Sequence, residues 1–468
     1  MALLWQGAFF PLQYIFLLII PFAAFALSKR PLRITLNTVL LVGLVLVMLA
    51  SLLIAAKAPQ IALREWLRYL LLPLYLLFFV TMQDKSAWYM RAFFGGIFWV
   101  ALLGLISYMG GFIIPAGVIE QSGRLQSTIQ YANTTALLML IGALYSAEYF
   151  VTTKKWRYPV YAAGFFCCLY LTGSRTTFVL FFFILVLLVL SRMQRKMRLM
   201  AIGGITTALI GIIIAGGRVI RLSLTEPTLI ERVITWQDGL SLAGQNPLFG
   251  LGIGNWQFEQ FLYQSAPYGV RYVHNYYVQL MLDGGILAAL LFGAVVLMCL
   301  WRGWKERNIH YYVVLAIVVH VLLDFDLAYG SVILILMFSL AQLPDRELTL
   351  FSCPNKPWRW IALLPAIVFL AMWVAEPNYI APDPLGAKYT EARQLSSAEQ
   401  YLPAIEKTEE LLYLWRYNEN YQAFYSELLT KAVDSGALTS DVRQQKLKTM
   451  EQNKAKVNPL YEKYIGNN

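Results

Sequence analysis

The sequence predicts an all-α, polytopic membrane protein with about 12 transmembrane helices and a small helical region at its C-terminal end. Three observations support this prediction. Of the 468 residues, 58% are hydrophobic and only 14% are charged, whereas about a quarter are charged in a typical soluble domain. Apolar runs of roughly 20 residues, the length of a helix that crosses a bilayer, recur between short charged loops. Charged residues become frequent only after residue 375.

We expect twelve membrane helices, several of them short enough to be tilted, paired or re-entrant. They cover residues 9–27, 34–56, 69–82, 92–115, 131–151, 158–171, 176–190, 199–216, 276–300, 311–328, 331–343 and 360–374.

Basic residues in the loops predict the orientation of these helices. Under strict alternation, clusters near residues 29–33, 85–91, 154–157, 192–198, 302–307 and 346–359 face one side, which the positive-inside rule assigns to the cytoplasm. The net charge of +11 therefore reflects membrane topology and gives no reason to expect nucleic-acid binding. Both termini and the long loop at 217–275 then lie outside. Lys57, Arg64 and Arg68 also fall outside and fit the rule poorly.

The chain divides into two expected domains. Residues 1–375 form a transmembrane domain, with 217–275 as its large extracytoplasmic loop. Residues 376–468 carry 13 acidic and 11 basic side chains, and prolines at 377, 382 and 384 separate them from the last membrane helix. Apolar positions between Tyr401 and Leu428 predict two or three packed helices. This second domain is expected to be soluble, helical and extracytoplasmic.

The large outer loop is expected to contain a helix from Pro227 to about Gly244, capped by Thr225. Arg232 and Trp236 lie one turn apart on one of its faces. Apolar side chains occupy another face, so we expect the helix to lie on the membrane with Arg232 turned towards a cavity. The glycines that follow read GxGxG without a surrounding βαβ unit, which excludes a dinucleotide site.

Arginines at the outer face act against the insertion bias and invite a local reason, such as an anionic ligand. They are Arg64, Arg68, Arg124, Arg175, Arg218, Arg221, Arg232 and Arg271. Arg175 follows Ser174, a candidate helix cap, and a cation at a helix N-terminus is unfavourable unless an anion joins it. Arg232 can hold a phosphate through two hydrogen bonds. Each arginine could equally be a solvated interfacial residue.

His274 lies at the same face and depth as these arginines. An imidazole can accept a proton from an attacking hydroxyl near neutral pH, although a capping or interfacial histidine is an equal alternative. Asp324 and Asp326, near His320, could form a proton relay or a pair that packs helices. Arg124, with Gln126, Gln130 and Asn133, forms a polar cluster that suits sugar hydroxyls or a plain loop.

The motifs together resemble the O-antigen ligase and polymerase family. GSR begins a membrane helix at Gly173, ERxxxW and NPLFGxGxGN occupy the outer loop, and HNxYxxxxxxGG enters the next membrane helix at His274. The resemblance covers about Arg124 to Asp326. It implies a GT-C-type fold and transfer of glycans from an undecaprenyl (polyprenyl) diphosphate carrier at the outer face of the cytoplasmic membrane. It implies no nucleotide sugar, cofactor or essential metal, and the outer loop contains no DxD, HExxH or Cys/His metal spacing.

The resemblance also implies roles for individual residues. Arg175 and Arg232 match the arginines that hold the carrier's diphosphate, and His274 matches the catalytic histidine of an inverting displacement. Arg124, Arg221, Trp236 and Asn275 are candidates for further substrate contacts. The implied partners are a polyprenyl diphosphate-linked glycan donor, a glycan, lipid or protein acceptor, and membrane lipids.

Other functions stay open at this level. The C-terminal region departs from short-tailed family members and is similar to longer-tailed relatives, including protein O-oligosaccharyltransferases, so the acceptor type is undecided. A lipid-linked glycan flippase or transporter would suit twelve spans, but it would be expected to show a repeat of the spans and polar groups near the midplane. A scaffold without chemistry would leave the histidine and arginines unexplained.

Overall fold

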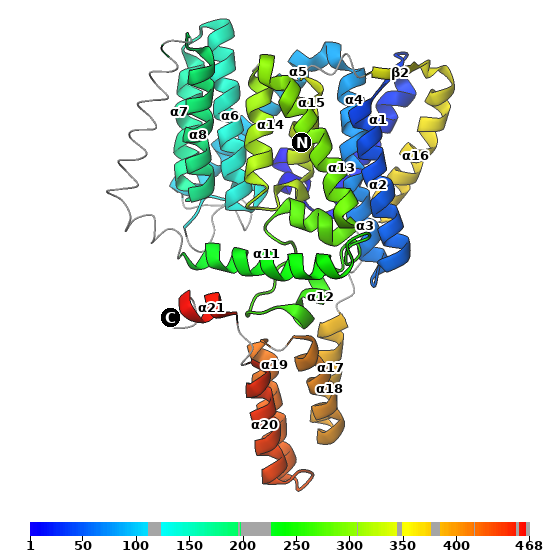
Figure 1. Cartoon of the computed structure of the whole chain (residues 1–468), viewed down its shortest axis with the longest axis vertical. Helices are drawn as coiled ribbons and strands as arrows, with labels where there is room; N and C mark the ends of the chain where they lie inside the picture. Colours follow the sequence, from blue (N-terminus) through cyan, green and yellow to red (C-terminus); the bar gives the residue numbers. More distant parts are fainter. Residues whose placement is uncertain are drawn as a thin grey trace.

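The computed structural model describes residues 1–110, 123–194, 197, 226–306, 308–343, 349–375, 384–415, 417–454 and 458–464. These residues are almost entirely helical, so the all-α prediction holds with one small exception, a two-stranded sheet. Long helices run side by side in a bundle, and α11 and α12 lie across one end of it (Figure 1). The helices α17 to α20 project beyond that same end.

The bundle helices follow the predicted apolar runs in order, except α3, which lies before the predicted run 69–82 and was not expected. They are α1 (Pro11–Leu27), α2 (Leu36–Ala55), α3 (Pro59–Tyr69), α4 (Leu71–Thr81), α5 (Ser86–Gly110), α6 (Ala132–Thr153), α7 (Arg157–Leu171), α8 (Arg175–Arg192), α13 (Tyr276–Glu306), α14 (Ile309–His320), α15 (Gly330–Ala341) and α16 (Asn355–Ala375). Short 3-10 helices occur at Ala2–Leu4, Gln6–Ala8, Gln83–Lys85, Ser127–Ile129 and Asp326–Ala328.

Within the described residues, five helices are long and apolar enough to cross a membrane. These are α2, α5 together with the short turn before it, α6, α8 and α13. The helices α1, α14 and α15 and the apolar part of α16 are shorter. The set indicates a multi-pass membrane protein, but it does not establish the count of twelve. The expected span 199–216 lies outside the described residues.

A small antiparallel sheet was not predicted from the sequence. It pairs β1 (Leu32–Thr35) with β2 (Thr349–Cys353), with Leu32 opposite Cys353. The sheet lies at the end of the bundle opposite α11 (Figure 1). The two strands are about 320 residues apart in the chain, so no local pattern marks their pairing.

The helix expected over 311–328 ends earlier than predicted. α14 stops at His320, and the chain continues irregularly to Tyr329 before α15 begins. The side chain of Asp324 accepts a hydrogen bond of 2.9 Å from the backbone N–H of Phe325. A carboxylate that binds nearby backbone in this way competes with helical hydrogen bonds. The segment between His320 and Tyr329 is thus an interruption between two short apolar helices.

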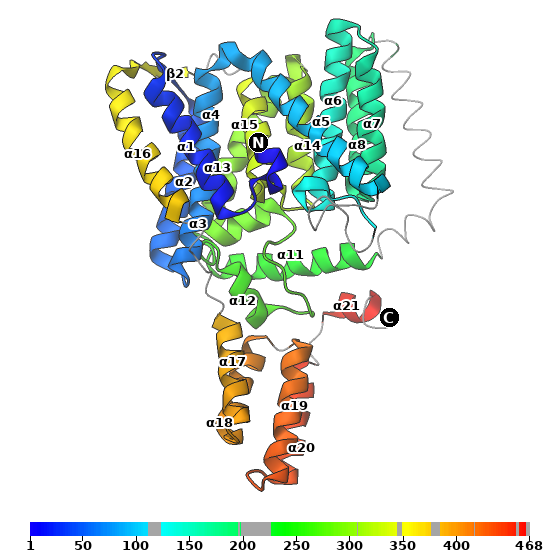
Figure 2. The ribbon, with the colours of Figure 1, turned by 180° about the vertical axis from the view of Figure 1, so that it is seen from behind.

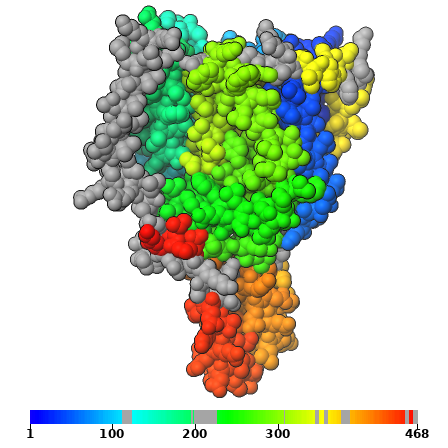
Figure 3. Space-filling view, viewed as in Figure 1, coloured from blue at the N-terminus to red at the C-terminus, as the bar shows by residue number. Residues whose placement is uncertain are grey.

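The expected helix of the outer loop is α11 (Pro227–Gln245), with Glu226 as its N-cap residue and Pro227 in its first turn. Thr225, the predicted cap, lies outside the described residues. The expectation that the apolar face rests on the membrane is wrong for Ile230 and Ile234. Both are buried with Ala266 against the last helix, α21 (Pro459–Tyr464). The space-filling view shows α21 (red) against one end of the green band that includes α11 (Figure 3).

The glycine-rich segment after α11 closes around a break in α13. Gly285 has a φ of +73°, which interrupts the helix. The carbonyl of Leu282, freed by the break, accepts hydrogen bonds from Leu251 at 2.7 Å and Gly252 at 3.3 Å. A Cβ on Gly285 would collide with the backbone of Leu248. These backbone amides are committed to α13, which agrees with the rejection of a dinucleotide site.

The C-terminal helices pack on one another around a hydrophobic cluster that includes Ile405, Tyr425 and Leu428. They are α17 (Pro384–Ser397), α18 (Tyr401–Leu414), α19 (Glu419–Asp434) and α20 (Ser440–Lys454). Figure 2 shows them beyond α12 (Trp256–Tyr263) from the opposite side. Trp415 stacks on Phe261 of α12 with ring centroids 4.2 Å apart. This stack joins the helices to the outer loop.

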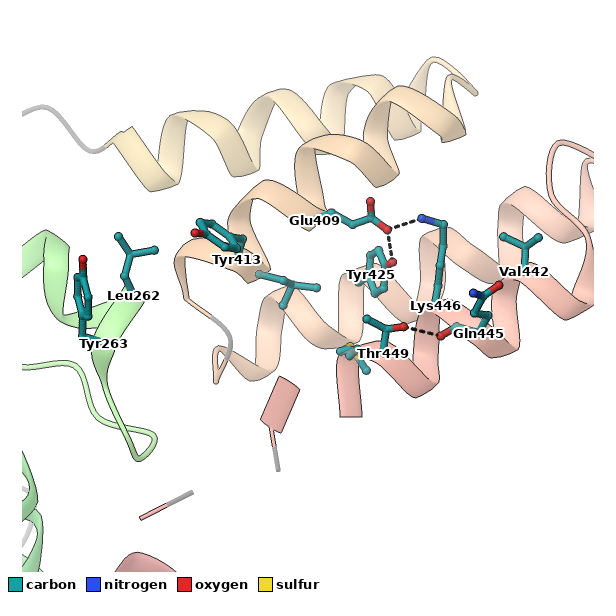
Figure 4. Close-up of a pocket in the computed structure, with 11 residues that line it drawn as sticks. Leu262, Tyr263, Glu409, Tyr413, Tyr425, Val442, Gln445, Lys446 and Thr449 are labelled. Atoms are coloured by element: carbon teal, nitrogen blue, oxygen red, sulfur yellow. Dashed lines mark hydrogen bonds and ion pairs between the residues drawn. The ribbon is translucent and has the colours of Figure 1, made fainter. Parts of the chain in front are cut away.

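A groove of about 790 Å³ lies between α12 and these helices. Tyr263 and Tyr413 are exposed in it, and at its floor Glu409 accepts hydrogen bonds from Tyr425 and Lys446 (Figure 4). None of the predicted site residues lines this groove. This groove is therefore separate from the candidate site.

Candidate functional site

Asp324 is the centre of a hydrogen-bond network at the end of the bundle that α11 covers. Its carboxylate accepts hydrogen bonds from the hydroxyl of Tyr131, at 2.9 and 3.1 Å, and from the amide of Asn133 at 2.7 Å. Arg232 donates to the same carboxylate at 3.3 Å and to the carbonyl of Leu323 at 2.6 Å. His274 Nδ1 lies 3.3 Å from the carboxylate. One buried anion thus joins two of the predicted site residues, Arg232 and His274.

The contacts of Asp324 favour its ionised form. Tyr131, Asn133 and Arg232 all donate hydrogen bonds to the carboxylate, and such bonds stabilise the charged state. An ionised carboxylate can only accept hydrogen bonds, so Nδ1 of His274 carries the proton between them. In a neutral imidazole Nε2 is then the acceptor. This arrangement directs the basic nitrogen of His274 away from Asp324.

Two further contacts fix His274 in place, and a helix cap fixes the residue that follows it. Its backbone carbonyl accepts a hydrogen bond of 3.1 Å from the indole of Trp236. Its ring meets the ring of Phe325 edge to face, with centroids 5.1 Å apart. The side-chain oxygen of Asn275 caps α13 by accepting from the backbone of Tyr277 at 3.0 Å and of Val278 at 3.1 Å. Trp236 and Asn275, predicted as substrate contacts, are therefore seen to hold His274 and the start of α13.

α11 brings Arg232 and Trp236 to the site because they lie one turn apart on the face that meets the bundle. Gly239 extends that face, and a Cβ there would lie 3.1 Å from Val278 of α13. The lack of a side chain lets the two helices approach closely. The side chain of Arg232 is only 19% exposed and contacts the Asp324 segment, whereas the cavity expected beside it stays a prediction.

Arg124 connects this network to the turn between α7 and α8. Its Nη2 donates to the side-chain oxygen of Asn133 at 2.8 Å, and its Nε donates to the carbonyl of Thr172, also at 2.8 Å. Asn133 in turn contacts Asp324. The predicted polar cluster around Arg124 is thus part of the site's supporting structure.

Arg175 occupies a different environment from Arg232. It begins α8, its side chain is 74% exposed, and it forms an ion pair with Glu226. The anion expected at this helix N-terminus is thus supplied by the protein itself. Glu226 is the N-cap residue of α11, six residues before Arg232, or about 9 Å along a helix axis. The two arginines therefore belong to one end of the protein, although Arg175 stands outside the Asp324 network.

Two other expectations have different outcomes. Ser174 is the N-cap residue of α8, as expected, but its side chain makes no capping hydrogen bond, because its hydroxyl lies 3.0 Å from that of Thr177 instead. Arg221, a predicted substrate contact, lies outside the described residues. Among the described residues no group of three or more His, Cys, Asp or Glu could hold a metal ion.

A second arginine cluster surrounds Glu65 on α3. Arg68 lies 2.5 Å from this carboxylate and Arg271 lies 3.2 Å from it, while Tyr272 donates to it at 3.0 Å. Burial raises the pKa of the Glu65 carboxyl, but the two arginines lower it more, so the net pKa is below the usual value. This cluster explains why Arg68 fitted the positive-inside rule poorly. Arg68 is the buried partner of Glu65, so its position is determined by packing and not by membrane orientation.

The sequence alone does not predict the central position of Asp324 or the contribution of Tyr131. It marks Asp324 only as a candidate for a relay or for helix packing, and Tyr131 only as the first residue of a membrane helix. A carboxylate within an apolar stretch is a signal of function by default. No sequence signal marks Tyr131, because its partner lies 193 residues away.

The comparison with protein families identifies one region of the chain. Residues 160–293 match the family model Wzy_C, described as O-antigen ligase. This region includes Arg175, Arg232 and His274, and it ends before Asp324. No curated protein matches the chain. Over these residues the chain is similar to the O-antigen ligase family, a glycosyltransferase-like ligase family.

Proposed function

We propose that this protein is a glycosyltransferase that moves a glycan from an undecaprenyl (polyprenyl) diphosphate carrier to an acceptor hydroxyl at the outer face of the cytoplasmic membrane. The observation that carries the proposal is the shared carboxylate of Asp324. It joins an arginine suited to a phosphate and a histidine suited to a hydroxyl. The match to the O-antigen ligase family model supports glycan transfer at a membrane.

In this proposal His274 is the general base. Its Nε2 takes the proton of the acceptor hydroxyl as the oxygen bonds to the anomeric carbon of the glycan. The bond between that carbon and the carrier's phosphate oxygen breaks, and its electron pair leaves with the diphosphate. Asp324 holds the imidazole in the required tautomer and stabilises the imidazolium that forms. Attack opposite the leaving group inverts the anomeric configuration.

The arginines stabilise the leaving diphosphate. Arg232 is partly buried, so its charge is weakly screened and acts strongly on charge that develops nearby. Arg175 is exposed and paired with Glu226, which a diphosphate would displace. The two guanidinium groups therefore supply the positive charge that stabilises the diphosphate as it leaves. No nucleotide sugar is required, since the carrier diphosphate is itself the leaving group.

The lengths of α14 and α15 are consistent with a site recessed into the membrane surface. Each has 12 residues, which span about 18 Å, whereas the hydrocarbon core is about 30 Å thick. The Asp324 segment that joins them therefore does not need to extend beyond the lipid surface. A carrier with its tail between helices and its diphosphate at the interface would reach such a site.

The proposed organisation has two domains, a transmembrane catalytic domain (1–375) and an extracytoplasmic helical domain (376–468). The helices α17 to α21 contact α11 and α12, which belong to the outer loop. This contact supports a role for the second domain near the outer loop and the acceptor. Whether the acceptor is a lipid, a glycan or a protein is an outcome of the experiment below.

Purified protein in proteoliposomes tests the proposal. It is incubated with an undecaprenyl diphosphate-linked glycan and, in separate reactions, with a lipid, glycan or protein acceptor. We expect release of undecaprenyl diphosphate together with a new glycosidic bond in one of the three reactions. Movement of the intact lipid-linked glycan across the bilayer without any change of bonds would instead identify a flippase and refute the transferase proposal.

A further inference from the structure

A second acid–histidine pair lies in the same segment as Asp324, and the mechanism above does not use it. His320 Nδ1 lies 2.5 Å from a carboxylate oxygen of Asp326, and both side chains are at most 1% exposed. The other ring nitrogen, Nε2, lies 2.8 Å from the hydroxyl of Thr177 in the first turn of α8. Each ring nitrogen of His320 therefore has a partner.

The contacts continue from this pair in two directions. The hydroxyl of Thr177 lies 3.0 Å from that of Ser174, the residue directly before Arg175. The hydroxyl of Thr134 on α6 donates to the second oxygen of Asp326 at 2.7 Å. A buried polar network in which all members have partners holds its elements in one arrangement. This network joins α6, the start of α8 and the segment that carries Asp324.

We infer that the His320–Asp326 pair is a positioning element for Arg175, acting through Thr177 and Ser174. The inference rests on the proposed function, because it assigns Arg175 to the donor. Since the guanidinium of Arg175 is 74% exposed, few side-chain contacts hold it, and the backbone at the start of α8 decides where it can reach. The hydroxyl contacts fix that backbone relative to the segment that also carries Asp324.

The other side of the same turn is held independently. Gly173 has a φ of +62°, and the carbonyl of Thr172 accepts the hydrogen bond from Arg124. The turn before α8 is thus fastened to the Asp324 network through Arg124 and Asn133, and to the inner pair through Thr177. The two connections set the spacing between Arg175 and His274. Loss of the connection through Thr177 should therefore change the KM for the donor more than the KM for the acceptor.

Thr177→Val tests this inference because it removes the hydroxyl and keeps a similar shape, and Thr177→Ser is the matched control that keeps the hydroxyl. We expect Thr177→Val to raise the KM for the undecaprenyl diphosphate-linked donor roughly tenfold, the size expected for one lost hydrogen bond. The acceptor KM should stay within about twofold. Thr177→Ser should resemble the unaltered protein.

The Arg175→Ala background distinguishes positioning from a general structural role. If Thr177 acts through Arg175, Thr177→Val should cause no further rise in donor KM once Arg175 is absent. An equal additional rise in that background, or an unchanged donor KM in the single variant, would overturn the inference.

Binding of undecaprenyl diphosphate alone can be measured in detergent, without catalysis. It compares the unaltered protein, Thr177→Val, Arg175→Ala and the double variant. If the protein bound the carrier through Arg175 and Thr177 but transferred no glycan, the proposed function would fail and the positioning inference would stand. If it transferred glycan normally in Thr177→Val, only the positioning inference would fail.

Discussion

Asp324 and Glu65 are both buried carboxylates that hold arginines, yet they leave their partners in different situations. The partners of Asp324 include Arg232, 19% exposed, and His274, 21% exposed. The principal partner of Glu65 is Arg68, which is only 4% exposed, and the hydroxyl of Tyr272 contacts both of them. The first cluster leaves a guanidinium and an imidazole within reach of a ligand. The second encloses Arg68 completely, although Arg271 at its edge is 40% exposed.

The difference teaches that an arginine on the outer side of a membrane protein is not by itself a sign of an anionic ligand. Arg68 and Arg232 both disagree with the positive-inside rule. In the structure, Arg68 is enclosed by Glu65 and Tyr272, whereas Arg232 combines a carboxylate with a neighbouring histidine. We therefore expect substitutions at the Asp324 cluster to reduce activity and substitutions at the Glu65 cluster to reduce stability.

The largest effect on activity is expected at Arg232. Arg232→Ala should lower kcat/KM for transfer by about 10²-fold or more, because a positioned donor to the developing charge is lost. Arg232→Lys is the informative control, since lysine keeps the charge but not the paired hydrogen bonds. We expect it to recover only part of the activity. Both variants should insert in the membrane in normal amounts, and an unaffected rate in Arg232→Ala would remove Arg232 from the site.

The largest effect on stability is expected at Glu65. Glu65→Ala leaves Arg68 buried without its carboxylate, and breaking one half of a buried pair costs about 3–5 kcal/mol. Thermal unfolding in detergent should show this loss. The molecules that remain folded should keep their donor KM. If Glu65→Ala were as stable as the unaltered protein but inactive, the assignment of the Glu65 cluster to stability would be wrong.

A pH titration sharpens the comparison. The pKa of Glu65 is lower in the folded protein than in the unfolded chain, so its contribution to stability is complete above the unfolded pKa, about 4.3. That contribution is lost as pH falls through the unfolded value towards the folded one. Unfolding temperatures measured from pH 7 to pH 3 should therefore fall less steeply in Glu65→Gln than in the unaltered protein. Parallel curves would contradict the assignment.

The smallest effect is expected at Glu226, which pairs with Arg175 at an exposed position. Glu226→Gln removes a carboxylate that competes with the donor's diphosphate. Because exposed ion pairs are worth little, the donor KM should fall by only about two- to threefold, and the effect should shrink at high salt. The acceptor KM serves as the internal control. A higher donor KM would mean that Glu226 helps to orient Arg175.

The sequence could predict those features that depend on local pattern. Apolar runs marked the bundle helices, and the spacing of Arg232 and Trp236 placed them on one face of α11. The Asp324 network depends instead on four segments far apart in the chain, which contribute Tyr131, Arg232, His274 and Asp324. A contact between such distant segments leaves no periodic pattern in the sequence. The early end of α14 was not predicted because the apolar run continues through Leu323, three residues beyond the end of the helix at His320.

The most direct test of the account is transfer by purified His274→Ala. Loss of a general base costs about 10²- to 10⁴-fold, so this variant should release almost no undecaprenyl diphosphate in the presence of donor and acceptor. It should still bind the carrier with an affinity close to that of the unaltered protein, because Arg175 and Arg232 are retained. Transfer at the unaltered rate by folded His274→Ala would contradict the account.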